Sequence, residues 1–215
     1  MNRIRIIALT LAALTLAALM LLAFAACSGD DGAGGGNEDG QAVAPIHEGH
    51  SDGDRFEVTV TAEGAEEKAN MEHLTGKYAS YVIDWFCDDF TYSSGEGSDC
   101  FTWNYDGDEL INYMAISEAL EYNRSDLSDL VEQNAAGEFD VIVRADAKIA
   151  SYDAILLSCT QPSSVIWPDN AVADYYFIDC GASCLMIELH YSTESAEGVG
   201  SRMKRMLETL ELTNA

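Results

Sequence analysis

Six cysteines carry the most varied chemistry in this 215-residue sequence. Cys27 directly follows an apolar segment, and the other five are Cys87, Cys100, Cys159, Cys180 and Cys184. Cys180 and Cys184 flank a short turn and form one possible disulfide, and Cys87 and Cys100 enclose a glycine-containing segment and form another. An odd number of remaining thiols leaves at least one free or paired with another chain. The sequence has no Cys-x-x-Cys pair, so we expect no zinc centre.

The segment His47-Glu-Gly-His50, followed by Asp52 and Asp54, is the most metal-like cluster. Imidazole and carboxylate groups are ligands for zinc, copper or nickel. The spacing is not the His-Glu-x-x-His of metalloproteases, and the surrounding glycine-rich segment would have to be ordered at an entropic cost. His47 and His50 are therefore weak metal candidates, and we expect no cofactor.

Catalytic motifs are scarce. Ser201-Arg-Met-Lys204 matches the Ser-x-x-Lys of penicillin-recognising enzymes, but the companion motifs of those enzymes are absent. The sequence has no Gly-x-Ser-x-Gly, no phosphate-binding loop and no calcium loop. These observations predict a protein that is not an enzyme.

Aromatic side chains are the remaining candidates for a binding surface, because an exposed ring can stack on a sugar or contact a partner. Most of them fit the core of a sheet equally well. Trp167 stands in a segment that ends at Pro168, so we expect it to lie on a loop and to be the first residue of any binding surface. The others of this set are Trp85, Trp103, Tyr105, Tyr113, Tyr175 and Tyr176.

The N-terminal segment has the order of a secretory signal. Arg3 and Arg5 precede an apolar run over 6–23, and Ala25-Ala26 then precede Cys27. This arrangement resembles the lipobox of bacterial lipoproteins, in which the cysteine is acylated with diacylglycerol and becomes the first residue of the mature chain. Phe24 departs from the pattern, since the family usually has an aliphatic residue there. The alternative is an uncleaved transmembrane helix, which also places the rest of the chain outside the cytoplasm.

The resemblance implies three regions: a signal peptide over 1–26, a lipidated Cys27 with a flexible, acidic, glycine-rich linker over 27–54, and a globular domain over 55–215. The expected location is the outer face of the cell membrane, with the membrane as one partner and an envelope protein as a possible second. Asp and Glu number 37 against 11 Lys and Arg, for a net charge of −26. A field of this sign repels phosphate backbones and excludes nucleic acid as a partner.

Alternating apolar residues and turn signals predict a strand-rich domain. The helices are expected over 65–74, from a Ser125 cap to Gly137, and along the apolar stripe of Val199, Met203, Met206, Leu207 and Leu210. Strands are expected over 56–61, 78–86, 90–92, 100–105, 110–117, 139–144, 152–160, 171–180 and 184–191. Asp106-Gly-Asp108 is a hairpin signal. The fold class is α+β, a single domain with an antiparallel sheet flanked by helices.

The order of these elements resembles that of PsbP-like domains. The resemblance rests on the strand pair over 101–116, the helix around 127–131 and the terminal helix over 199–210. It implies an accessory or assembly role, so the predicted function is a membrane-anchored, non-enzymatic binding or accessory module. The alternatives are a cell-envelope hydrolase with a site of dispersed residues, and a lipoprotein that captures cations or metal ions through its acidic tether.

Overall fold

Two antiparallel sheets make up most of the domain. The computed structural model describes residues 49–62, 65–105, 112–162 and 170–213. The smaller sheet has the strand order β1-β2-β3-β11. Its strands are β1 (Arg55–Ala62), β2 (Ala65–Thr75), β3 (Tyr81–Phe86) and β11 (Glu211–Leu212).

The larger, seven-stranded sheet has the order β4-β5-β6-β10-β9-β8-β7. Its strands are β4 (Phe90–Gly95), β5 (Ser98–Trp103), β6 (Tyr113–Leu120), β7 (Phe139–Ile149), β8 (Tyr152–Pro162), β9 (Ala171–Asp179) and β10 (Ser183–Ser192). The predicted hairpin of β9 and β10 is confirmed. Strands β5 and β6 also pair, although the Asp106-Gly-Asp108 signal between them lies outside the described residues.

The helix predicted over 65–74 is wrong, because this segment is strand β2. Pairing with β1 places Met71 opposite Phe56 and Ala69 opposite Val58. Ion pairs across the two strands, Arg55–Glu72 and Lys68–Glu57, add to this arrangement. The residues Ala65-Glu-Glu-Lys favour a helix by their intrinsic propensities. Pairing with a neighbouring strand outweighs this preference, and propensities of single residues take no account of such a partner.

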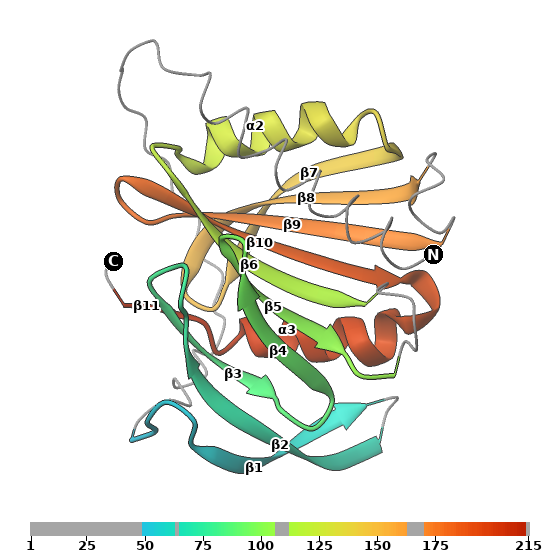
Figure 1. The fold of residues 1–215 in the computed structure, drawn as a ribbon. Coiled ribbons are helices and arrows are strands. Elements are labelled where there is room, and N and C mark those ends of the chain that lie inside the picture. Colours follow the sequence, from blue (N-terminus) through green and yellow to red (C-terminus); the bar gives the residue numbers. More distant parts are fainter. Residues whose placement is uncertain (1–48, 63–64, 106–111, 163–169, 214–215) are drawn as a thin grey trace. The chain divides into compact units, whose positions relative to one another are not determined.

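Helix α2 (Arg124–Ala135) begins two residues earlier than predicted. Asn123 is its N-cap, and the Asn123 side chain accepts a hydrogen bond from the backbone N–H of Asp126. Leu127 and Val131 are buried, and the helix covers one face of the large sheet (Figure 1). The position of the helix was therefore predictable, but its capping residue was not.

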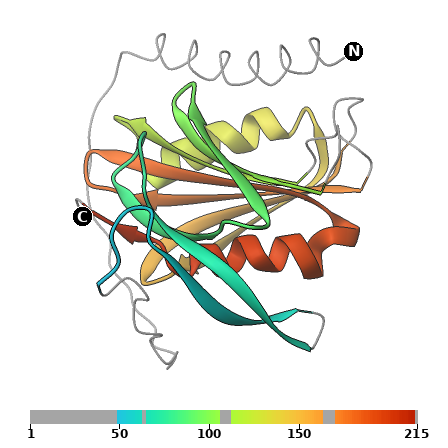
Figure 2. The same cartoon turned by 60° about the horizontal axis from the view of Figure 1, so that its bottom comes forward.

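The C-terminal segment packs against the opposite face of the large sheet, together with the smaller sheet (Figure 2). The predicted apolar stripe from Val199 to Leu210 is buried throughout. The helix itself is less regular than predicted: a 3-10 turn at Thr193–Ser195 and a π-helical turn at Ala196–Gly200 precede α3 (Ser201–Leu207). Two glycines, Gly198 and Gly200, weaken the α-helical preference there.

The architecture is sheet-dominated, so the prediction of a sheet flanked by helices is correct only in part. The main core lies between the large sheet, α3 and the smaller sheet. Its largest fully buried side chains include Tyr81, Phe86, Phe90, Phe101 and Phe177. Within the described part of the chain, no helix has the length and apolar character that crossing a bilayer requires.

Candidate functional site

An aromatic row runs along the hairpin of β4 and β5. Trp103 is paired with Phe90 in the strand register, and Phe101 with Tyr92. The ring centroids of these pairs are 5.1 Å and 5.3 Å apart. Such contacts hold the two strands together through cross-strand packing of aromatic side chains.

One end of this row is closed by a buried carboxylate, Asp99. Its Oδ2 accepts hydrogen bonds from the backbone N–H of Lys77, at 2.9 Å, and from the hydroxyl of Tyr81, at 3.0 Å. Its Oδ1 accepts one from the hydroxyl of Tyr92 at 2.7 Å. Burial and the contact with Asp99 raise the pKa of Tyr92 to about 12 and raise the pKa of Tyr81 as well.

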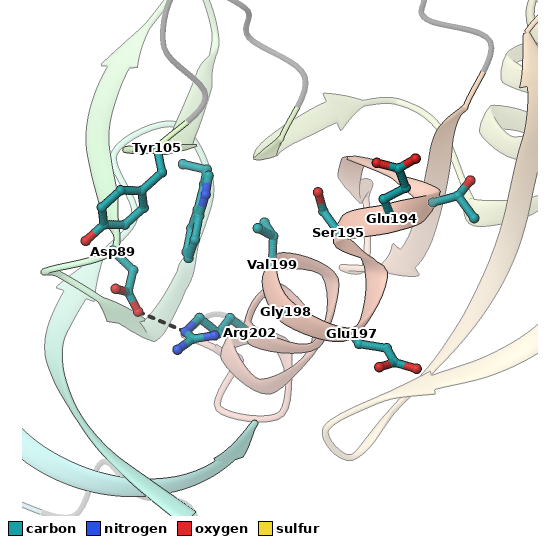
Figure 3. A pocket seen from close by; sticks show the side chains of 10 residues that line it. Asp89, Tyr105, Glu194, Ser195, Glu197, Gly198, Val199 and Arg202 are labelled. Atoms are coloured by element: carbon teal, nitrogen blue, oxygen red, sulfur yellow. Dashed lines mark hydrogen bonds and ion pairs between the residues drawn. The ribbon is translucent and has the colours of Figure 1, made fainter. Parts of the chain in front are cut away.

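The other end of the row opens into a groove of about 660 Å³. Trp103 and Tyr105 form its aromatic wall, with ring centroids 5.1 Å apart, and Tyr105 is 70% exposed. The turns that precede α3 form the facing wall (Figure 3). Its lining residues are Asp89, Trp103, Tyr105, Thr193, Glu194, Ser195, Glu197, Gly198, Val199 and Arg202.

Arg202 fixes the position of α3 at the base of the groove. Its Nε lies 2.9 Å from Oδ2 of Asp89, and its Nη2 pairs with Glu67 on β2. The guanidinium also lies over the ring of Trp103, 5.8 Å from the centroid. Arg202 therefore neutralises two acids and occupies an aromatic face that would otherwise be available to a ligand.

The facing wall is anchored by backbone and hydroxyl contacts. The N–H and the hydroxyl of Thr193 both donate to the carbonyl oxygen of Asn170, at 2.7 Å and 2.9 Å. The hydroxyls of Ser192 and Ser195 lie 2.6 Å apart. Glu194 and Glu197 are exposed on this wall, across the groove from Tyr105, and the Glu197 side chain points away from Tyr105 (Figure 3). The groove thus has an aromatic side and an acidic side.

A second polar cluster lies on the other face of the large sheet. The imidazole Nε2 of His190 is 2.6 Å from Oε1 of Glu188, and the hydroxyl of Tyr113 donates to the same oxygen at 2.9 Å. The rings of Tyr113 and His190 stack, with centroids 4.7 Å apart. Burial alone would raise the pKa of Glu188, but His190 and the two hydrogen bonds outweigh it and the pKa is lowered. Glu188 is therefore a carboxylate at neutral pH, whereas a general acid needs a raised pKa.

The five cysteines in the described part of the chain are free thiols. In the hairpin of β9 and β10 the register pairs Cys184 with Asp179, and Cys180 follows the last residue of β9. Cys87 follows β3 of the small sheet, whereas Cys100 lies on β5 of the large one. Both pairings suggested by spacing are therefore unformed here, and disulfide formation stays a prediction. Burial raises the pKa of all five thiols.

The structure describes only some of the other predicted site residues. Cys27, His47 and Trp167 lie outside the described residues. The ring of His50 is tilted against that of Phe56, with centroids 4.2 Å apart, and its centroid lies 6.4 Å from that of His73. No group of three or more His, Cys, Asp or Glu residues in the described part of the chain has the geometry of a metal site.

The Ser201 and Lys204 side chains have separate structural contacts. The Ser201 hydroxyl donates to the carbonyl oxygens of Glu197 and Gly198. Lys204 lies 3.8 Å from Oδ2 of the buried Asp174 and 5.6 Å from the ring centroid of Tyr191. The arrangement is that of a helix with local side-chain contacts, not of an acylating pair.

Of the aromatic set named from the sequence, the groove includes Trp103 and Tyr105, while Trp85, Tyr113 and Tyr176 are buried. The sequence did not indicate the contact between Arg202 and Asp89, which are 113 residues apart in the chain. The signal available for the groove was the pair Trp103 and Tyr105, two positions apart at the end of a strand.

Comparison with known proteins gives a similarity of fold only. No family model and no curated protein matches the sequence. A solved structure from Bacteroides thetaiotaomicron VPI-5482 is 16% identical, with a TM-score of 0.43, over 65% of this chain and 47% of that one. The chain thus spans about half the length of that protein.

Two further solved structures are similar. PsbP (CyanoP) from Synechocystis sp. PCC 6803 is 8% identical, with a TM-score of 0.46, over 66% of this chain and 92% of that one. LpqN, involved in cell envelope biogenesis of Mycobacterium tuberculosis, is 11% identical, with a TM-score of 0.39, over 74% and 91%. A PsbP is thus among the similar structures, as the order of the elements predicted. With TM-scores this low, the similarities say nothing of function.

Proposed function

We propose that this protein is a membrane-tethered, extracytoplasmic binding module that contacts its partner through the groove between Tyr105 and the turns before α3. The observation that carries the proposal is the exposure of Tyr105, 70%, next to the partly buried Trp103. Aromatic side chains that are held in place but remain accessible are typical of the centre of a binding surface. The tether is the lipidated Cys27 expected from the lipobox, followed by the linker.

Three features favour binding over catalysis. The thiol pKa values are raised, which disfavours thiolate nucleophiles. The hydroxyl of Ser201 donates to backbone carbonyl oxygens. The Asp89 carboxylate at the groove is held in an ion pair with Arg202, so it is already engaged by a side chain of the protein itself. The alternative of a cell-envelope hydrolase therefore has less support than a binding module.

Photo-cross-linking in native membranes tests the proposal. A photoreactive amino acid replaces Tyr105 in the groove or, as a control of similar exposure, Val143 on β7, which is 55% exposed. We expect one dominant protein adduct from position 105 and none from position 143. In the Cys27→Ala background the adduct should disappear if tethering brings the partner within reach. Equal adducts from both positions, or none from either, would contradict the proposal.

A further inference from the structure

The two sides of the groove differ in a way that identifies the chemistry of its occupant. One side carries the ring of Tyr105, and the other carries the exposed Glu194 together with Glu197, whose side chain points away from Tyr105 (Figure 3). A cation is the group that both sides attract, since aromatic faces and carboxylates each stabilise a positive charge. An anionic occupant would meet the exposed acid Glu194, within a chain whose net charge is −26.

The protein already contains an example of this contact. The guanidinium of Arg202 lies over Trp103 and pairs with Asp89 and Glu67. An aromatic ring and carboxylates thus hold an arginine side chain at the base of the groove. Tyr105 and Glu194, higher on the two walls, offer the same kinds of group to an arginine or lysine that arrives from outside (Figure 3).

We propose that the groove binds a basic peptide segment of an envelope protein, with a cationic side chain between Tyr105 and Glu194. A volume of about 660 Å³ is in the range of sites that accept a ligand larger than one side chain. A neutral saccharide is disfavoured because Trp103 has its ring face covered by Arg202 and further contacts with Phe90 and Tyr105. The inference rests on the proposed binding function and specifies its ligand.

Calorimetric titration of the full-length protein in phosphatidylcholine nanodiscs tests the ligand class. The probe is a blocked peptide with three arginines separated by glycines, and its matched control replaces each arginine with citrulline, which has the same shape without the charge. We expect saturable binding of the arginine peptide only. The affinity should fall by about tenfold or more for the Glu194→Gln, Glu197→Gln variant, and should weaken as salt is added.

Three further variants separate binding in the groove from the general electrostatic field of the protein. Asp140→Asn, Asp146→Asn removes the same charge from exposed positions on β7 and should bind normally. Gly198→Leu adds a side chain at a position lining the groove where a Cβ meets no atom within 4 Å, and should block binding; Gly95→Leu adds it to similarly open space on β4 and should not.

Equal loss of affinity in the two charge variants would overturn the inference, because the attraction would then come from net charge alone. Equal binding of the citrulline peptide, or preferential binding of a neutral N-acetylglucosamine oligosaccharide, would also overturn it. In either case an adduct from position 105 in membranes would leave the proposed binding function in place. If the calorimetric titration and the cross-linking both gave the contrary result, the ligand class and the proposed binding function would both be overturned.

Discussion

Strand β5 presents two polar sites on one face, and they are built in opposite ways. Asp99, Phe101 and Trp103 alternate along this face, with Phe101 fully buried between the two ends. At one end the carboxylate of Asp99 is completely enclosed, and its hydrogen-bond donors come from the chain itself. At the other end, Trp103 meets the exposed ring of Tyr105 in an open groove.

The difference shows how a structural polar cluster is distinguished from a binding surface. Asp99 accepts hydrogen bonds from two tyrosine hydroxyls and from the backbone N–H groups of Lys77 and Tyr78, and its complete burial closes it to a ligand. In the groove, Arg202 satisfies Asp89, but Tyr105 and Glu194 stay exposed. Changes at the closed end should therefore alter the free energy of unfolding, and changes at the open end should alter binding.

The largest effect is expected for Asp99→Ala. Removing the carboxylate leaves the hydroxyls of Tyr81 and Tyr92 and the N–H of Lys77 without their acceptor. We expect the free energy of unfolding to fall by about 3 kcal/mol, measured by urea denaturation. Asp99→Asn keeps one acceptor oxygen and should lose less. A loss under about 1 kcal/mol for Asp99→Ala would mean that the cluster does not hold the hairpin.

Gly76→Ala tests the same closed end through packing. A Cβ at position 76 would lie 2.3 Å from the ring of Tyr81, and that ring is fixed by its hydroxyl on Asp99. Because neither the backbone nor the ring can move freely, we expect a loss of about 2 kcal/mol in urea denaturation. Gly95→Ala is the matched control, since a Cβ there meets no atom within 4 Å. Equal losses at the two positions would contradict the packing argument.

A smaller effect is expected from high pH, which should lower the free energy of unfolding through the hydroxyl of Tyr92 at the closed end. The pKa of Tyr92 is raised to about 12, whereas a tyrosine in the unfolded chain titrates near 10. Between these values the folded chain holds more protons than the unfolded chain, so stability falls as the pH rises. Tyr92→Phe should cost about 1 kcal/mol at neutral pH through the lost hydrogen bond and should make the alkaline decline shallower. An unchanged slope in urea denaturation against pH would refute this assignment.

Most strands of the domain were predictable, because the alternation of apolar residues indicates which face of a strand is buried. The burial of Tyr81, Ile83 and Trp85 and the pairing of β9 with β10 followed from that pattern. The prediction of a helix over 65–74 was wrong for a specific reason. Its charged residues favour a helix locally, and only pairing with β1 makes the segment a strand.

The groove was only half predictable. Trp103 and Tyr105 could be named as candidates because their residue types are visible, but exposure depends on what packs against them. The contact of Arg202 with Asp89 joins positions 113 residues apart, and no local pattern encodes such a distance. The structural role of Asp99 was not predictable either, because an acidic residue within a strand is expected to face solvent unless its hydrogen-bond partners are known.

At the open end, Arg202→Met should have a smaller effect on stability. Methionine keeps the apolar packing of the side chain but removes the ion pairs with Asp89 and Glu67 and the contact with the Trp103 ring. Since the groove is open to water, we expect a loss of about 1 kcal/mol in urea denaturation. The loss should shrink in high salt, unlike that of Asp99→Ala. A loss as large as that of Asp99→Ala would remove the contrast between the two ends.

The smallest effect, and the only gain, is expected for Gly198→Ala. A Cβ at position 198 meets no atom within 4 Å, and alanine restricts the unfolded chain more than glycine does. We expect stability to rise by about 0.5 kcal/mol. At Gly200 a Cβ would lie 3.4 Å from the ring of Tyr191, so Gly200→Ala should gain less or lose stability. Glycine at position 198 would then lower stability slightly while it keeps the groove open, whereas glycine at position 76 is required by the packing of Tyr81. If Gly198→Ala were destabilising, the fold would require glycine at position 198 as it does at position 76, and the contrast between the two positions would be lost.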